Sequence, residues 1–160
     1  MKLNRRLFTT GLITALPVSI IPMRAFAAEA IAGTMYKNPT CTCCETYAAY
    51  LERNGFTIKL IPTNDLDQVG AKYGVPAELR GCHTITFGNY IVEGFVPVEH
   101  VKKMLATMPQ ITGLAMPGMP MDIPGMGFDS GSPQPGNTYT TYAFTKGDPK
   151  PSVYATYPQA

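Results

Sequence analysis

Residues 31–61 read IAGTMYKNPTCTCCETYAAYLERNGFTIKLI, and this stretch decides the fold. Residues 31–36 form an apolar run that predicts a short strand, and residues 56–61 alternate apolar and polar side chains as a half-buried strand does. Between the two strands the apolar residues change to a helical period, in the set Cys44, Tyr47, Ala48 and Leu51. Gly55 is suited to end that helix. The stretch therefore predicts a strand, a helix and a second strand.

The rest of the domain continues the alternation of helices and strands. A helix is expected over residues 66–73, followed by a hairpin of residues 84–87 and 90–95 around Gly-Asn. A third helix follows, in which Met104 and Met108 are expected to face the core. This order predicts a small α/β domain with a mixed four-stranded sheet and flanking helices. Because a Cys-x-x-Cys motif joins the first strand to the first helix, the domain is expected to be thioredoxin-like.

The first segment of the chain is typical of an export signal. Its features are a basic start, an apolar run and an Ala-x-Ala cleavage site, supplied by Lys2, Arg5 and Arg6, by residues 11–23, and by residues 25–27. The double arginine leaves the general secretory and twin-arginine routes both open. We therefore expect a periplasmic protein that keeps no stable membrane span once residues 1–27 are removed.

The net charge argues against nucleic acid as a partner. The formal charge of the chain is +2, but four of its 13 basic residues lie in the export signal, which leaves nine against 11 acidic residues, or −2. A binder of nucleic acid is not expected at that charge.

The expected organisation is an export signal, a thioredoxin-like metal-binding domain, a Met/Pro/Gly-rich loop and a C-terminal β-hairpin packed on the domain, at residues 1–27, 28–112, 113–137 and 138–160.

Soft ligands gather at the start of the first predicted helix. Cys41, Cys43 and Cys44 share one turn, where the positive end of the helix dipole favours thiolates. Cys82 begins the third predicted strand, which in a thioredoxin-like layout lies beside that helix terminus, and His83 follows it. Three thiols on one turn and a fourth opposite them favour soft metal ions, Cu(I) above all, with room for more than one ion per chain.

Other chemistries remain open for these cysteines. Zinc also binds four thiolates, although structural zinc ligands usually come as two separated pairs. Structural disulfides are found in exported proteins. A dithiol enzyme would use Cys41 and Cys44, but such enzymes carry a cis-proline before the third strand, where this chain has Arg80, Gly81 and Cys82. The cysteines alone therefore leave metal binding, redox chemistry and a zinc-stabilised interaction module as alternatives.

A methionine-rich segment follows the third predicted helix. It holds four methionines within eleven residues of Pro/Gly-rich sequence, namely Met116, Met119, Met121 and Met126. Thioethers bind Cu(I) and hardly bind zinc, so this segment favours copper. The competing interpretation is that these side chains simply pack on the domain.

Several motifs together resemble the CopG-like copper-resistance family, long described as a domain of unknown function. They follow one another in the order of that family, as MYKNPTCTCC (35–44), GVPAEL (74–79), GCHT (81–84), EGFVP (93–97) and GLAMPGMP (113–120). The resemblance covers about residues 33–126. The resemblance implies a thioredoxin-like fold, an envelope location and copper binding through the four cysteines, with His83 in the same motif. The chain departs from the family at three positions, where Thr42 replaces a usual Gly, Tyr47 a common Trp and Phe95 a usual His.

These observations predict a periplasmic protein that sequesters Cu(I) or hands it on, and so contributes to copper resistance. The expected metal ligands are Cys41, Cys43, Cys44, Cys82, His83, Met116, Met119, Met121 and Met126. Other periplasmic copper carriers or efflux components are the expected partners. The alternative is a thiol-disulfide or copper oxidoreductase that uses the Cys41/Cys44 pair, so the sequence leaves open whether the protein is an enzyme.

Overall fold

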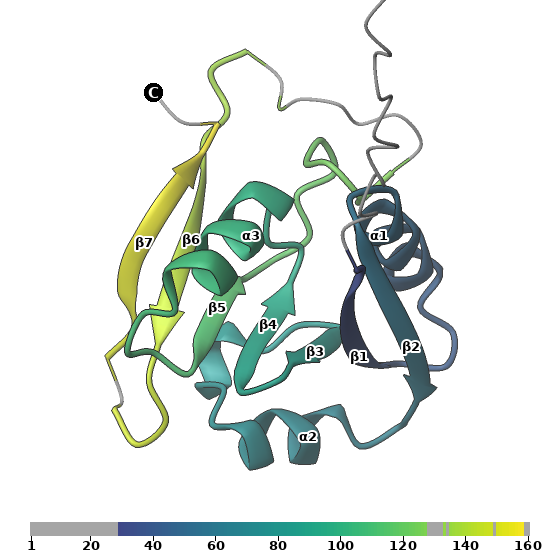
Figure 1. Cartoon of the computed structure of the whole chain (residues 1–160), viewed down its shortest axis with the longest axis horizontal. Helices are drawn as coiled ribbons and strands as arrows, with labels where there is room; N and C mark the ends of the chain where they lie inside the picture. Colours follow the sequence, from purple (N-terminus) through teal and green to yellow (C-terminus); the bar gives the residue numbers. More distant parts are fainter. Residues whose placement is uncertain (1–28, 128–132, 134, 149, 159–160) are drawn as a thin grey trace, which may run out of the picture.

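The computed structural model describes residues 29–127, 133, 135–148 and 150–158. The expected export signal, residues 1–27, lies outside the described residues. Along the chain the elements are β1 (Ile31–Lys37), α1 (Thr42–Arg53), β2 (Phe56–Pro62), α2 (Leu66–Tyr73), the short 3-10 helix η1 (Ala77–Leu79), β3 (His83–Phe87), β4 (Tyr90–Gly94), α3 (Val98–Thr107), β5 (Gly113–Met116), β6 (Tyr139–Phe144) and β7 (Ser152–Tyr157) (Figure 1). In this part of the chain, no helix has both the length and the apolar character that crossing a bilayer requires.

The strands form one mixed sheet, which confirms the predicted α/β class. Within the described residues the sheet has seven strands in the order β2-β1-β3-β4-β5-β6-β7 (Figure 1). Strand β1 pairs in parallel with β2 and antiparallel with β3, and β4 continues the sheet antiparallel to β3. The register of β1 with β3 places Lys37 opposite His83. This pairing brings the end of β1, where the cysteine motif starts, beside the start of β3.

The sheet is larger than the four strands expected, because β5 extends it and joins it to β6 and β7, the strands of the predicted C-terminal hairpin. Residues 113–116 lie in the segment expected as a loop, yet they form β5, parallel to β4. All four of these residues are buried, so the strand is covered on both faces. Burial of these side chains stabilises a strand here relative to a solvent-exposed loop. Strand β5 then pairs with β6, and the hairpin of β6 and β7 extends the sheet at its edge.

Helices lie on both faces of the sheet. Helices α1 and α3 share one hydrophobic cluster with alternate residues of the strands, including Leu51, Met35 and Val101. The opposite face carries a second cluster under α2 and η1, to which β6 contributes Phe144. The cysteine-bearing end of α1 thus belongs to the first of these two layers.

The structure corrects one expected core position on α3. Met104 is fully buried, as expected, but 67% of Met108 is exposed. The helix ends at Thr107, and Met108 follows it with φ 45°, in the left-handed region. The helical period therefore stops before Met108, and its side chain leaves the buried stripe.

The C-terminal hairpin should contribute to the stability of the whole domain. Phe144 is 2% exposed, and we expect Phe144→Ala to lower the free energy of unfolding by about 3–5 kcal/mol. Urea denaturation measures the loss. The matched control is Val153→Ala on β7, where the side chain is 66% exposed and a change within about 0.5 kcal/mol is expected. Equal effects of the two variants would contradict an integral role for the hairpin.

Candidate metal centre

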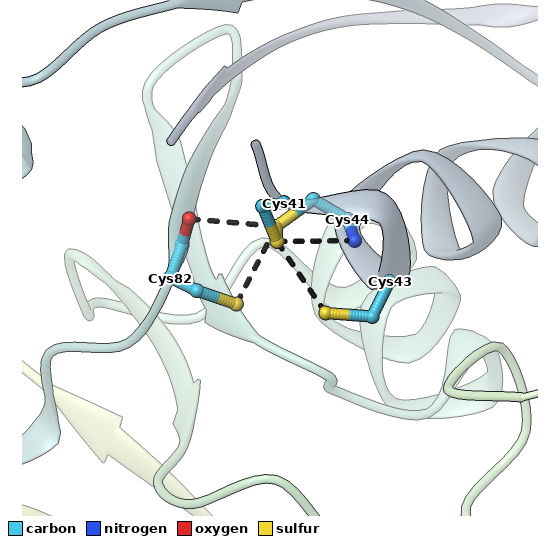
Figure 2. Close-up of side chains that lie close together, drawn as sticks. All are labelled: Cys41, Cys43, Cys44 and Cys82. Atoms are coloured by element: carbon cyan, nitrogen blue, oxygen red, sulfur yellow. Dashed lines mark hydrogen bonds between the residues drawn. A yellow bond between two sulfur atoms is a disulfide. The ribbon is translucent and has the colours of Figure 1, made fainter. Parts of the chain in front are cut away.

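The cysteine motif forms the N-terminus of α1. Cys41 is the residue that caps the helix, and its sulfur accepts a hydrogen bond from the backbone N–H of Cys44 at 3.3 Å. The i, i+3 spacing brings the Cα atoms of Cys41 and Cys44 to 5.4 Å, and the two residues form a disulfide (Figure 2). Cys43 points to the same site, with its sulfur 3.4 Å from that of Cys41.

Cys82 completes the cluster from a distant part of the chain. Its sulfur lies 3.4 Å from the sulfur of Cys44, and its carbonyl oxygen lies 3.5 Å from the same atom (Figure 2). The four cysteine sulfurs all lie within 4.8 Å of one another. The expectation that Cys82 meets the helix N-terminus in space is therefore confirmed.

The disulfide means that the site is partly oxidised, whereas a fully reduced site was expected. Four thiols were expected to be available together, but in this structure the free cysteines are Cys43 and Cys82. The reason is local, because the first turn of a helix holds residues i and i+3 within the Cα separation that a disulfide needs. The site can thus exist as a disulfide with two thiols or, after reduction, as four thiols.

His83 lies beside the cluster and is fully buried. Its Nε2 is 3.1 Å from the carbonyl oxygen of Gly94, and its Nδ1 is 3.5 Å from the sulfur of Cys82. Since a carbonyl oxygen only accepts, Nε2 carries the proton and Nδ1 presents a lone pair to the cluster. Burial lowers the pKa of His83 to about 4, so the ring is neutral at pH 7. A neutral imidazole nitrogen in this position is a competent metal ligand.

Two aromatic rings hold the imidazole in place. Tyr47 and Phe95 lie 5.1 Å and 5.0 Å from the His83 ring, measured between centroids, and Phe95 packs edge-on. The hydroxyl of Tyr47 donates to the carbonyl of Val96 at 2.6 Å, which ties α1 to the segment after β4. Phe95 therefore supplies an apolar wall at the position where the resembled family usually has a His.

Burial also affects the thiol of Cys82. Burial, and to a smaller extent the neighbouring Cys43, raises the pKa of Cys82 to about 12. Cys82 is therefore a neutral thiol at pH 7 and a weak nucleophile. A metal that binds it must displace the proton.

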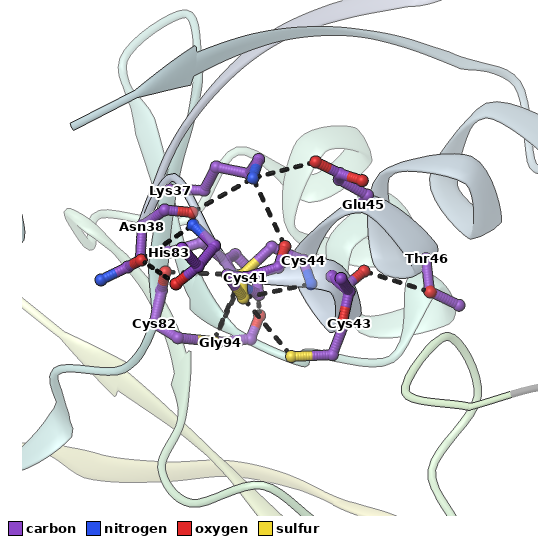
Figure 3. The surroundings of a disulfide bond; sticks show 12 residues. Lys37, Asn38, Cys41, Cys43, Cys44, Glu45, Thr46, Cys82, His83 and Gly94 are labelled. Atoms are coloured by element: carbon purple, nitrogen blue, oxygen red, sulfur yellow. Dashed lines mark hydrogen bonds and ion pairs between the residues drawn. A yellow bond between two sulfur atoms is a disulfide. The ribbon is translucent and has the colours of Figure 1, made fainter.

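A buried lysine holds the loop that leads into the cysteine motif. The Nζ of Lys37 donates to the carbonyls of Asn38, Pro39 and Cys41 at 3.1, 3.2 and 3.4 Å. It also forms an ion pair with Glu45 at 3.0 Å (Figure 3). Lys37 is only 2% exposed, so these contacts compensate the cost of burying its charge.

A buried carboxylate on β4 contacts the other cysteine-bearing segment. Glu93 accepts hydrogen bonds from the backbone N–H of Gly81 at 2.6 Å and from the hydroxyl of Thr84 at 2.7 Å. Burial raises its pKa to about 7. Neither Lys37 nor Glu93 was predicted as a site residue, although an acidic residue inside the apolar run of β4 is a sequence signal of a buried polar site.

The methionines of the predicted segment separate into two pairs. Met116 and Met126 are 2% and 7% exposed and belong to the main hydrophobic cluster, together with Cys44. Met119 and Met121 are 60% and 73% exposed. The competing interpretation, that the methionines pack on the domain, therefore holds for Met116 and Met126. Copper contact by any of the four stays a prediction.

Comparisons with known proteins identify the family. The chain is similar to two solved structures of copper resistance protein CopG. The structure titled form 2 is 30% identical in sequence, with a TM-score of 0.70, and the match covers 81% of this chain and 100% of that chain. The structure titled form 1 is 32% identical, with a TM-score of 0.70, and the match covers 81% of this chain and 99% of that chain. The chain belongs to the CopG-like copper-resistance family. A family model described as "Protein of unknown function, DUF411" also matches residues 79–126. No curated protein matches the chain in sequence.

Membership in the CopG-like family agrees with the geometry of the site. The cysteine cluster is a group that could hold a metal ion, and its relatives are named for copper resistance. Together they support a role related to copper. The family model starts at Leu79 and ends at Met126, so it includes Cys82 and Glu93 but not the cysteines of α1.

The buried carboxyl group should make stability depend on pH. Because the pKa of Glu93 is raised from 4.5 to about 7, the folded protein binds this proton more tightly than the unfolded chain. Its stabilising effect is present below pH 4.5 and is lost as the pH rises through 7. Glu93→Gln keeps an acceptor and a donor but does not titrate. Relative to wild type, we expect this variant to gain stability from pH 4.5 to 8, by up to about 3 kcal/mol.

Urea denaturation across this pH range measures the difference. The titration of His83 is present in both proteins and cancels in the comparison. The control is Glu52→Gln on the exposed side of α1. A gain that is equal for the two variants, or independent of pH, would contradict the assignment to Glu93.

Proposed function

We propose that the protein is exported to the periplasm, where it sequesters Cu(I) or hands it to another carrier and so contributes to copper resistance. The ligands are the thiolates of Cys41, Cys43, Cys44 and Cys82. The observation that carries the proposal is that these four sulfurs lie within 4.8 Å of one another. Thiolates select soft ions such as Cu(I), and family membership favours copper over zinc.

The full ligand set requires reduction of the disulfide between Cys41 and Cys44. Reduction takes two electrons and two protons from two thiols or from one dithiol, which becomes a disulfide, and yields the thiols of Cys41 and Cys44. Cu(I) then displaces the thiol protons. In the oxidised form Cys43 and Cys82 are the free cysteines, so copper capacity depends on the redox state of the cluster.

Further ligands are proposed around the thiolates. The Nδ1 of His83 faces Cys82 and can supply a nitrogen. The exposed Met119 and Met121 are suited to weak, transient contact with arriving Cu(I), whereas the buried Met116 and Met126 are suited to contact from within the core. Four closely spaced sulfurs can also bridge more than one ion.

The fold and location belong to the same proposal. Strands β2-β1-β3-β4 with α1 and α3 form a thioredoxin-like unit, a reading supported by the parallel β1–β2 pair and by the antiparallel β1–β3 and β3–β4 pairs. Residues 1–27 direct export, 28–112 carry the metal-binding domain, 113–137 the methionine segment and 138–160 the hairpin extension. Other periplasmic copper carriers or efflux components are the partners that receive the ion.

Anaerobic titration of the reduced protein, residues 28–160, with Cu(I) against a competing chelator tests the proposal. We expect at least one tightly held Cu(I) per chain, and a lower stoichiometry after oxidation to the disulfide. Cys82→Ser should lower the stoichiometry as much as Cys41→Ser, because both sulfurs belong to one cluster. Joint replacement of the four methionines should have a smaller effect, chiefly on the rate of transfer.

The controls separate copper from zinc and ligand loss from unfolding. Circular dichroism should show that each cysteine variant stays folded, because the domain has its own hydrophobic core. Failure of the reduced protein to hold one Cu(I), or retention of Zn²⁺ in competition with Cu(I), would overturn the proposal. Melting of the metal-free protein at room temperature would instead favour a structural zinc site.

A second candidate function is redox catalysis at the same site. The observation that favours it is the disulfide between Cys41 and Cys44 at the N-terminus of α1, where a dipole stabilises the thiolate. As a thiol-disulfide oxidoreductase the protein would exchange this disulfide with a substrate dithiol. As a copper oxidoreductase it would pass one electron between a bound copper ion and an external electron donor or acceptor. The raised pKa of Cys82 weighs against its use as an attacking thiol.

Turnover of the metal-free protein distinguishes the two functions. A thiol-disulfide oxidoreductase should reduce insulin in the presence of a dithiol, and Cys44→Ser should abolish the reaction. For a copper-binding protein we expect a rate no higher than that of the Cys44→Ser variant. The insulin precipitation assay measures both rates, and a wild-type rate well above that of Cys44→Ser would favour the enzyme.

A further inference from the structure

The segment that carries Cys82 does not follow strand geometry. Strand β3 begins at His83, and Cys82 lies in a bend directly before it. Side chains alternate along a strand, so an extended chain would send Cys82 and His83 to opposite faces of the sheet. Here the sulfur of Cys82 is 3.4 Å from that of Cys44 and 3.5 Å from Nδ1 of His83. The bend therefore brings both side chains to one site.

Glu93 spans this bend from the neighbouring strand. One carboxylate oxygen, Oε1, accepts from the backbone N–H of Gly81 at 2.6 Å, before the bend. The other, Oε2, accepts from the hydroxyl of Thr84 at 2.7 Å, after the bend. The register of β3 with β4 places Thr84 opposite Glu93. The carboxylate thus bridges the two ends of the segment that contains Cys82 and His83.

A carboxylate at this position is costly for the fold. Glu93 is 1% exposed, and its neighbours Ile91 and Val92 in β4 are buried apolar residues. An apolar residue would fit this strand better, because burying a carboxylate costs free energy even when it is hydrogen-bonded. A residue that breaks the local pattern at such a cost points to a functional requirement.

We infer that Glu93 is a positioning residue, which holds the bend at Cys82 so that this sulfur reaches the cluster on α1. The inference rests on the proposed copper function and deepens it by assigning a further residue to the same site. Glu93 acts through Gly81 and Thr84, by hydrogen bonds to both ends of the bend. Its effect on copper binding therefore passes through Cys82.

Cu(I) competition with the reduced protein tests this role. Glu93→Leu removes both hydrogen bonds, and we expect it to weaken Cu(I) binding by about tenfold to a hundredfold, as loss of a residue that orients a ligand does. Glu93→Gln keeps both hydrogen bonds and should stay within about threefold of wild type. In a Cys82→Ser background, Glu93→Leu should add less than about twofold, because the ligand it positions is already absent.

A matched variant excludes a general loss of stability. Thr141→Val removes a buried hydrogen bond in β6, between the Thr141 hydroxyl and Nδ1 of His100. We expect it to leave Cu(I) affinity unchanged. Weakening by Thr141→Val equal to that by Glu93→Leu would overturn the inference, as would additive effects of Glu93→Leu and Cys82→Ser.

A measurement without copper keeps this inference separate from the proposed function. In the oxidised, metal-free protein, Cys43 and Cys82 are the free thiols, and iodoacetamide labelling followed by peptide mass mapping gives the rate at each. We expect Glu93→Leu to raise the rate at Cys82 at least about fivefold without changing Cys43, and Glu93→Gln to change neither. Altered labelling with no Cu(I) binding by wild type would support the positioning role and reject the copper function. Unaltered labelling would overturn the positioning role.

Discussion

The antiparallel pairing of β1 with β3 is the constraint on which the site depends. It places Lys37, the last residue of β1, opposite His83, the first residue of β3. The cysteine motif follows the end of one strand, and Cys82 precedes the start of the other. Two segments about 40 residues apart in the sequence thus meet at one end of the sheet. Any shift of this register would separate Cys82 from the helix that carries the other three cysteines.

Two buried side chains, one basic and one acidic, hold the two cysteine-bearing segments that the strand register brings together. Lys37 binds carbonyls of the loop before α1, and Glu93 binds both ends of the bend before β3. Each of these two side chains bonds to backbone and side-chain groups around the cysteines, which leaves the sulfurs free for metal or for disulfide formation. The main core lies under the same end of α1 and includes Cys44 itself. The site thus packs against the core on one side and is accessible through the partly exposed Cys43 and Cys82.

Much of this arrangement could be predicted because it follows from local patterns. The helical period from Cys44 to Leu51, the extent of the helix over residues 66–73 and the alternation of Phe56 and Ile58 depend on neighbours in the sequence. The four-stranded sheet was an underestimate because β5, which is only four residues long and is buried on both faces, joins the predicted hairpin of β6 and β7 to the other four strands. Met108 left the predicted stripe because the helix ended one residue earlier than the period implied.

The sequence by itself determined the residue types of the proposed ligands, the helix terminus at which three of the cysteines lie and the family motifs, since these depend on residue identity and spacing. The tertiary structure decided which groups meet. It set the bend by which Cys82 makes its predicted approach to the cluster, turned Nδ1 of His83 toward that sulfur and divided the methionines into a buried and an exposed pair. These outcomes depend on strand register and on contacts across the sheet between residues distant in the sequence, which no local pattern encodes.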